Sequence, residues 1–233
     1  MKRLSLALLG VLLVALTGCA PAGPRPVTAD EAETLAIVRL MNFTEGTREV
    51  TSTVTENGAE LQLSGWIDYV SHVGYVSVTG DGFDPQALLW TEDRIGITTA
   101  EPDENGLPPL PILPLDDDAW TSRPLDAAGS PLDATLVALG NLGGDRPENP
   151  LLLQQTGALW LRDDSVGGVP VTVFAAPPSD VALEASAPPV AEDDSPLRLW
   201  VTDDGLALRV ELRGTDGVWT TIDYGASGPS LTL

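Results

Sequence analysis

The sequence contains one cysteine, one histidine and one lysine among its 233 residues. A single cysteine forms no disulfide within the chain, so packing alone must stabilise the fold. A single histidine excludes a metal site with two histidine ligands. The lysine, Lys2, lies in an N-terminal segment that we expect to be removed, which excludes a lysine Schiff base and a serine–lysine pair.

Motifs of the common enzyme families are missing as well. The sequence has no GxSxG nucleophile motif, no Walker loop and no GxGxxG motif. His72 stands between Ser71 and Val73 without recognisable catalytic partners, which favours an exposed turn residue. We therefore expect no catalytic residue, no metal site and no cofactor.

Basic residues are scarce. The chain has 12 lysines and arginines against 34 aspartates and glutamates, a net charge of −22. Because residues 1–18 hold Lys2, Arg3 and no acidic residue, the remaining chain has ten basic residues and a net charge of −24. Phosphate backbones and anionic lipid head groups repel such a surface. Nucleic acid is therefore excluded as a partner, and a membrane contact cannot depend on a polybasic patch.

The N-terminal apolar run is too short to span a bilayer, which takes roughly 20 residues. It covers residues 4–16, follows Lys2 and Arg3, and is succeeded by the small residues Thr17 and Gly18. This order of charged, apolar and small segments is typical of a secretory signal peptide.

The end of this segment, Leu16-Thr17-Gly18-Cys19, resembles the bacterial lipobox, whose cysteine receives a diacylglyceryl thioether and becomes the first residue after cleavage. The resemblance implies that residues 1–18 are removed and that Cys19 anchors the chain at the outer face of the cytoplasmic membrane. Two acyl chains give stable anchoring. The alternative is an ordinary cleaved signal with a chance cysteine. Residues 19–27 are rich in proline and predict an extended tether.

The spacing of apolar residues in the remainder, 28–233, predicts one domain of antiparallel strands with helices. Thr28 and Glu31 form a capping box for a helix that ends at Gly46. Apolar residues then alternate with polar ones, which predicts antiparallel strands with one face in water. Strands are expected at residues 48–55, 60–69, 73–79, 86–91, 94–99, 169–174, 197–201, 206–212 and 218–225.

Residues 101–130 predict a long, stiff excursion, because prolines 108, 109, 111 and 114 exclude a central strand. Ser130 and Pro131 predict a helix start, and a second short helix is expected near Pro150.

Trp66 and Trp200 fall on the strand face opposite the aliphatic residues, which predicts a covering helix or loop there, or the rim of a cavity.

Paired acidic residues are the remaining chemical candidates. They occur at 116–118, 163–164, 193–194 and 203–204, and none has the alternating ligand spacing of a calcium loop. Aspartate is common in turns, so solvated turns are the favoured interpretation. Two carboxylates can also serve as the acid and base of a glycan hydrolase, and this alternative stays open.

The whole mature chain resembles the actinobacterial LppX and LprG lipoproteins and, more distantly, LolA. The residues that carry this resemblance are Cys19 in its lipobox, the strand GGVPVTVF at 167–174, LRLWVTDDGLALRVEL at 197–212 and TTIDYG at 220–225. The resemblance implies an α+β fold, an unclosed antiparallel half-barrel covered by helices, with an apolar cavity that accommodates acyl chains. The proline-rich segment 107–114 has no counterpart in that pattern.

A curved sheet with one aliphatic face must cover that face, and an incomplete cover leaves an apolar pocket. The residues expected to line such a pocket are Leu35, Val38, Met41, Leu61, Leu63, Ile67, Val171, Val173, Leu199, Val201, Leu208, Val210 and Ile222. The alternative for each is a place in a dry, packed core.

Three functions follow from these observations, in order of preference. The first is a membrane-anchored lipoprotein that binds a lipid or lipidated molecule without covalent chemistry. In the finer form of this hypothesis, the protein also transports that molecule. The second is an envelope module that binds a protein partner through its acidic surface or its tryptophan-bearing loops. The third is the carboxylate-based glycan hydrolase.

Overall fold

A computed structural model describes residues 23–114, 117–177, 195–214 and 217–231. Cys19, the predicted signal peptide and the acidic pair at 193–194 lie outside these ranges. The strands are β1 (Arg25–Pro26), β2 (Thr47–Glu56), β3 (Ala59–Asp68), β4 (Val73–Gly80), β5 (Phe83–Trp90), β6 (Arg94–Thr99), β7 (Thr121–Pro124), β8 (Leu159–Val166), β9 (Val169–Ala175), β10 (Leu197–Val201), β11 (Ala207–Arg213) and β12 (Trp219–Ser227).

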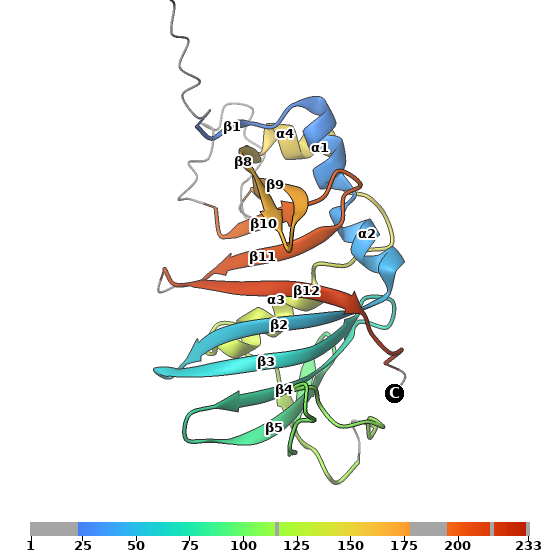
Figure 1. Cartoon of the computed structure of the whole chain (residues 1–233), viewed down its shortest axis with the longest axis vertical. Coiled ribbons are helices and arrows are strands. Elements are labelled where there is room, and N and C mark those ends of the chain that lie inside the picture. Colours follow the sequence, from blue (N-terminus) through green and yellow to red (C-terminus); the bar gives the residue numbers. More distant parts are fainter. Residues whose placement is uncertain (1–22, 115–116, 178–194, 215–216, 232–233) are drawn as a thin grey trace, which may run out of the picture.

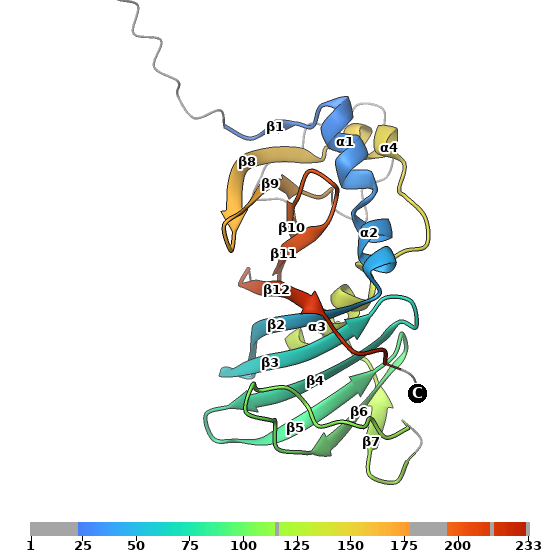
Figure 2. The same cartoon turned by 45° about the vertical axis from the view of Figure 1, so that its right-hand side comes forward.

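These strands form one antiparallel sheet of twelve strands in the order β1-β8-β9-β10-β11-β12-β2-β3-β4-β5-β6-β7. Figure 1 shows β1 at one end of the sheet, and Figure 2 shows β7 at the other. These edge strands do not pair with each other, so the sheet stays open. Pairing of β12 with β2 joins the N-terminal and C-terminal halves. The predicted α+β class, an unclosed antiparallel half-barrel with covering helices, is confirmed.

Within these ranges four helices accompany the sheet: α1 (Ala29–Ala36), α2 (Val38–Glu45), α3 (Pro131–Gly140) and α4 (Pro150–Gln155). The sequence predicts one helix from Thr28 to Gly46, whereas the structure has two that meet at Ile37. The break has a distant cause: the Ala36 carbonyl accepts a hydrogen bond from the backbone N–H of Glu148 at 2.8 Å. None of the helices within the described residues is long and apolar enough to cross a membrane.

The main core lies between the helices and one face of the sheet (Figure 2). The strands contribute Val54, Ile67, Val76 and Leu88, and each helix adds residues such as Leu136 of α3. α3 packs across β2 and β4, behind the centre of the sheet in Figure 1. Aliphatic residues at alternate strand positions supply this face, and their burial is the main favourable contribution to folding.

The second face of the sheet is covered in part, which corrects the expectation that it faces water. Trp66 packs there with Tyr75, Trp120 and Leu231, under the proline-rich excursion and the C-terminal segment. Trp200 packs on the same side with Val171 and other residues of β8 and β9. Trp66 is thus buried under a covering loop, as one of the two predicted alternatives requires, whereas Trp200 is buried among side chains of neighbouring strands.

Three strands were not expected. β7 is an exposed edge strand inside the excursion, and β1 pairs with β8 in a segment that composition assigns to the tether. In β8, Asp163 and Asp164 occupy strand positions, which corrects their interpretation as turn residues.

Candidate functional site

An apolar groove opens on the helix-covered side, between α3 and the strands β10 to β12. Its volume is ≈ 590 Å³, within the roughly 300–1,000 Å³ typical of small-molecule sites. We call it the α3 groove. Its lining residues are Arg39, Pro131, Ala134, Thr135, Ala138, Asn141, Leu142, Glu148, Pro177, Pro196, Leu197, Leu212, Arg213, Gly214 and Thr220.

The local sequence explains why this space is open. Leu197 and Leu212 are partners in the register of β10 and β11 and supply aliphatic side chains to the sheet side of the groove. The facing helix presents Ala134 and Ala138, which are four residues apart and therefore lie on one face. Small side chains there leave a channel where larger ones would close it.

The groove also has a polar end near Arg39 and Glu148. The Nη2 of Arg39 donates to the Gly143 carbonyl at 3.0 Å, and its Nη1 lies 3.4 Å from Glu148 Oε1. The Nε of Arg39 is buried and has no hydrogen-bond partner among the described residues. An apolar channel with a charged end suits an amphipathic ligand.

An ion pair fixes the helix wall of the groove. Asp133 is fully buried, and its carboxylate accepts hydrogen bonds from both Nη1 and Nη2 of Arg123, at 2.5 and 2.8 Å. The backbone N–H of Asp126 adds a third hydrogen bond at 2.7 Å. Burial raises the pKa of Asp133, but the hydrogen bonds from Arg123 and Asp126 and the arginine charge outweigh it and lower the pKa overall. β7 therefore holds the first turn of α3 in place.

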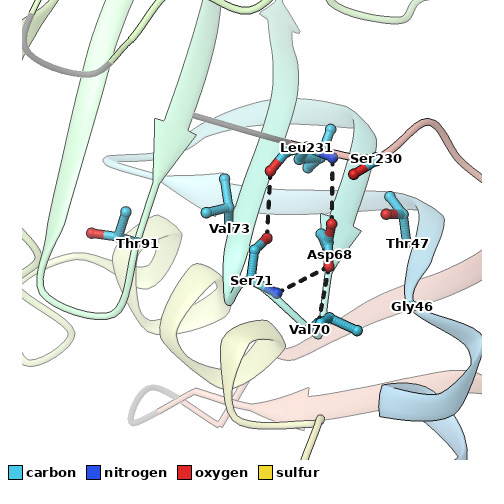
Figure 3. A pocket seen from close by; sticks show the side chains of 9 residues that line it. All are labelled: Gly46, Thr47, Asp68, Val70, Ser71, Val73, Thr91, Ser230 and Leu231. Carbon is cyan, nitrogen blue, oxygen red and sulfur yellow. Dashed lines mark hydrogen bonds between the residues drawn. The ribbon is translucent and has the colours of Figure 1, made fainter.

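A second hollow, of ≈ 630 Å³, lies at the end of β3 and β4 around Asp68 (Figure 3). Asp68 Oδ1 accepts the backbone N–H groups of Val70 and Ser71 at 2.9 and 3.1 Å, and its Oδ2 accepts that of Leu231 at 3.3 Å. Burial raises the pKa of Asp68, and these hydrogen bonds, with one from Thr47, lower it further than burial raises it. The carboxylate thus holds the β3–β4 turn and the C-terminal segment together, which is a structural role.

A third hollow, of ≈ 470 Å³, lies beyond the C-terminal end of α3 and includes His72, Trp90 and Glu92. His72 is an exposed turn residue, as predicted, with a φ of 55°. Each of the three hollows has one carboxylate in its lining: Asp68, Glu92 or Glu148. None of the three therefore brings together the acid–base pair of a glycan hydrolase. The described residues also contain no cluster of three or more potential metal ligands.

The thirteen residues predicted to line a cavity divide into two groups. The first group lies on the helix-covered face. Met41 is half-buried there beside Gly205, and nine residues are buried in the main core: Leu35, Val38, Leu61, Leu63, Ile67, Leu199, Val201, Val210 and Ile222. The other three, Val171, Val173 and Leu208, pack on the opposite face with Trp200.

A β-bulge explains the place of Leu208. Val201 pairs with Ala207 and Trp200 with Arg209, so Leu208 is an extra residue between two paired ones. Simple alternation across this point assigns it to the wrong face. None of the thirteen lines the three hollows, and their role in an acyl-chain cavity stays a prediction. The α3 groove itself was not expected: Ala134 and Ala138 indicate a helix face of small residues, but the sequence does not show which strands that face meets.

No protein-family model matches this chain, and no curated protein matches it. Among solved structures, the chain is similar to the lipoprotein LppX of Mycobacterium tuberculosis, at 12% identity and a TM-score of 0.44, over 84% of this chain and 93% of that one. It is also similar to LprF of Mycobacterium bovis, at 11% identity and a TM-score of 0.41, over 89% and 96% of the two chains. A third similarity is to MucB in complex with MucA(peri), at 12% identity and a TM-score of 0.35, over 87% of this chain and 59% of MucB.

Proposed function

We propose that this protein is an exported lipoprotein that binds the acyl chain of a lipid or lipidated molecule in the α3 groove, without covalent chemistry. The observation that carries the proposal is an apolar groove of ≈ 590 Å³ on the helix-covered side of an open sheet. Burial of an acyl chain contributes about 0.8 kcal/mol per methylene, so a short segment already gives useful affinity. The residues expected to line an acyl cavity lie mostly in the packed core beneath the helices and line none of the three hollows, so the α3 groove is the binding site proposed.

The N-terminal sequence supports the place where this binding would occur. The apolar segment followed by Leu16-Thr17-Gly18-Cys19 fits a signal peptide with a lipobox. Acylation at Cys19 would hold the domain at the outer face of the cytoplasmic membrane, where lipids are within reach of the groove. Transfer of the bound lipid to another carrier is the finer version of this function.

Native mass spectrometry of the purified protein, followed by organic extraction, tests the proposal. We expect discrete adducts of lipid mass on the wild-type chain. Ala138→Trp places a large side chain in the groove and should reduce adduct abundance at least fivefold. The control, Ala29→Trp, places the same side chain at an exposed position at the start of α1 and should retain the adducts.

Two results would contradict this proposal in different ways. Equal adducts on Ala138→Trp would show that the lipid binds outside the α3 groove. A protein without adducts after incubation with membrane lipids would remove the lipid-binding function altogether.

In that second case the envelope interaction module becomes the better hypothesis. Leu110 and Leu113 of the proline-rich excursion are exposed by 54% and 43%. Exposed aliphatic residues in a proline-rich segment form a surface suited to a protein partner.

A further inference from the structure

α4 presents two leucines to the outside of a strongly acidic protein. Leu151 is 58% exposed and Leu152 is 38% exposed, whereas Leu153 packs into the main core. The helix, PLLLQQ, contains no charged residue, although the chain as a whole has a net charge of −22. An exposed apolar surface without charged residues favours contact with another apolar surface.

The backbone under these leucines is well fixed. The side chain of Asn149 accepts hydrogen bonds from the N–H groups of Leu151 and Leu152, at 3.0 and 3.4 Å. The Thr156 N–H donates to the Leu152 carbonyl at 2.8 Å, and α4 packs on α1. The two exposed side chains are therefore held outside while Leu153 anchors the helix.

The position of α4 relative to the start of the chain indicates what it meets. Figures 1 and 2 both show α4 at the end of the molecule where β1 and α1 lie. Gly23 lies four positions after Cys19, and four residues span at most about 14 Å when fully extended. An acylated Cys19 would therefore hold this end of the domain against the bilayer.

We propose that α4 docks on the membrane surface, with Leu151 and Leu152 inserted among zwitterionic lipids. This inference rests on the acyl anchor of the proposed function. Anionic lipids are disfavoured by the charge of the domain. Two leucines alone bind a bilayer weakly, but the anchor makes their insertion intramolecular and so raises the effective concentration. Because Glu148 lies two residues before α4 and lines the α3 groove, docking also brings the polar end of the groove toward the lipids.

The lone cysteine makes this testable in the full, acylated chain. Once Cys19 carries its thioether, Leu151→Cys supplies the only free thiol, which is labelled with an environment-sensitive nitrobenzoxadiazole dye. The protein is reconstituted into phosphatidylcholine vesicles with and without doxyl-labelled phosphatidylcholine. Leu110→Cys is the matched control, since Leu110 is 54% exposed and lies in the excursion at the other end of the molecule.

We expect doxyl lipid to quench the dye at position 151 at least twofold more than the dye at position 110. Equal quenching at the two positions, or none at either, overturns the docking proposal. A blue shift at 151 without doxyl quenching overturns it too, since a protein or a second copy then covers α4. A chain that does not float with the vesicles removes the anchor and the docking together.

The lipid adducts seen by native mass spectrometry are an independent readout. Adducts on a protein whose dye at 151 stays unquenched contradict only the docking of α4. Quenching at 151 on a protein without adducts contradicts only the acyl-chain function of the groove.

Discussion

The phenolic oxygens of Tyr69 and Tyr224 lie 2.6 Å apart in the core, although 155 residues separate them in the sequence. Tyr69 follows β3 and Tyr224 belongs to β12, so their hydrogen bond crosses the sheet where the two halves of the chain meet. Arg48 lies over the Tyr224 ring at 4.2 Å and donates to Asn42 of α2 at 3.0 Å. The result is a small buried polar network, and such networks are costly to leave half satisfied.

Removal of one hydroxyl of this pair should therefore destabilise the protein. Tyr224→Phe keeps the ring and leaves the Tyr69 hydroxyl buried without a partner, which should lower the free energy of unfolding by about 1–3 kcal/mol. The double variant Tyr69→Phe/Tyr224→Phe should lose clearly less than the sum of the two single losses, because no orphaned hydroxyl remains. Urea unfolding of the three variants measures this, and strictly additive losses would show that the pair does not act as a unit.

All three tyrosines of the chain should resist ionisation while the protein is folded. Burial raises the pKa of Tyr75 and of Tyr224 to about 12, and raises that of Tyr69 well above its ordinary value of 10.0. These raised pKa values add stability that is complete below pH 10 and is lost as the pH rises toward about 12.

The absorbance at 295 nm should accordingly stay flat in the native protein up to about pH 11, while the protein in guanidinium chloride titrates near pH 10. A native titration curve that coincides with the unfolded one would contradict the burial of these hydroxyls.

The sheet could be predicted because its pattern is local. In β3, Leu61, Leu63 and Ile67 alternate with polar residues over ten positions, and the structure pairs this strand with β2 and β4 as expected of an antiparallel meander. The capping box of α1 was predictable for the same reason, since Thr28 and Glu31 lie within one turn.

Features decided by distant residues could not be predicted from local patterns. Asp163 and Asp164 lie in the exposed second half of β8, where local sequence favours a turn. The strand conformation there depends on pairing with β9 and on the hydrogen bond that Trp200 donates to Asp164. The α1–α2 break depends on Glu148, far along the chain, and the face of Leu208 depends on a bulge. The α3 groove is of this kind too, because its width depends on where α3 sits over the strands.

Glu31 should make the start of α1 sensitive to acid. Both of its carboxylate oxygens accept hydrogen bonds from the Arg25 guanidinium at 2.7 Å, and one also accepts a hydrogen bond from the Thr28 N–H at 2.8 Å. The hydrogen bond from Arg25, together with those from Thr28 and the arginine charge, outweighs burial and lowers the pKa of Glu31 to about 2. A lowered pKa means that this stabilisation is complete above about pH 4.5 and is lost as the pH falls toward about 2.

Glu31→Gln should therefore cost about 1 kcal/mol of unfolding free energy at pH 7, and almost nothing near pH 2. Chemical denaturation at both pH values tests this. Glu33→Gln, an exposed position of the same helix, serves as the control and should change stability by less than about 0.5 kcal/mol. An equal loss for Glu31→Gln at both pH values would mean that its charge is not the stabilising feature.

The ion pair of Arg123 and Asp133 should matter for both stability and the groove. Arg123→Gln removes the charge that faces a fully buried carboxylate, and because the Arg123 side chain is itself 41% exposed, the free energy of unfolding should fall by about 1–3 kcal/mol. The pKa of Asp133 should rise at the same time, because the main hydrogen bond that lowers it is gone. Since Asp133 lies in the first turn of α3, lipid adducts in the α3 groove should also decrease.

The matched control is Arg146→Gln. Its pair with Asp145 is a 3.9 Å contact between side chains that are 89% and 77% exposed, and such exposed pairs contribute about 0–1 kcal/mol. Urea unfolding and native mass spectrometry of the two variants separate the effects. If Arg123→Gln loses stability but keeps its adducts, the ion pair stabilises the fold without shaping the groove. If the variant is fully folded and still loses its adducts, the position of α3 controls binding, because Asp133 directly precedes Ala134, which lines the groove.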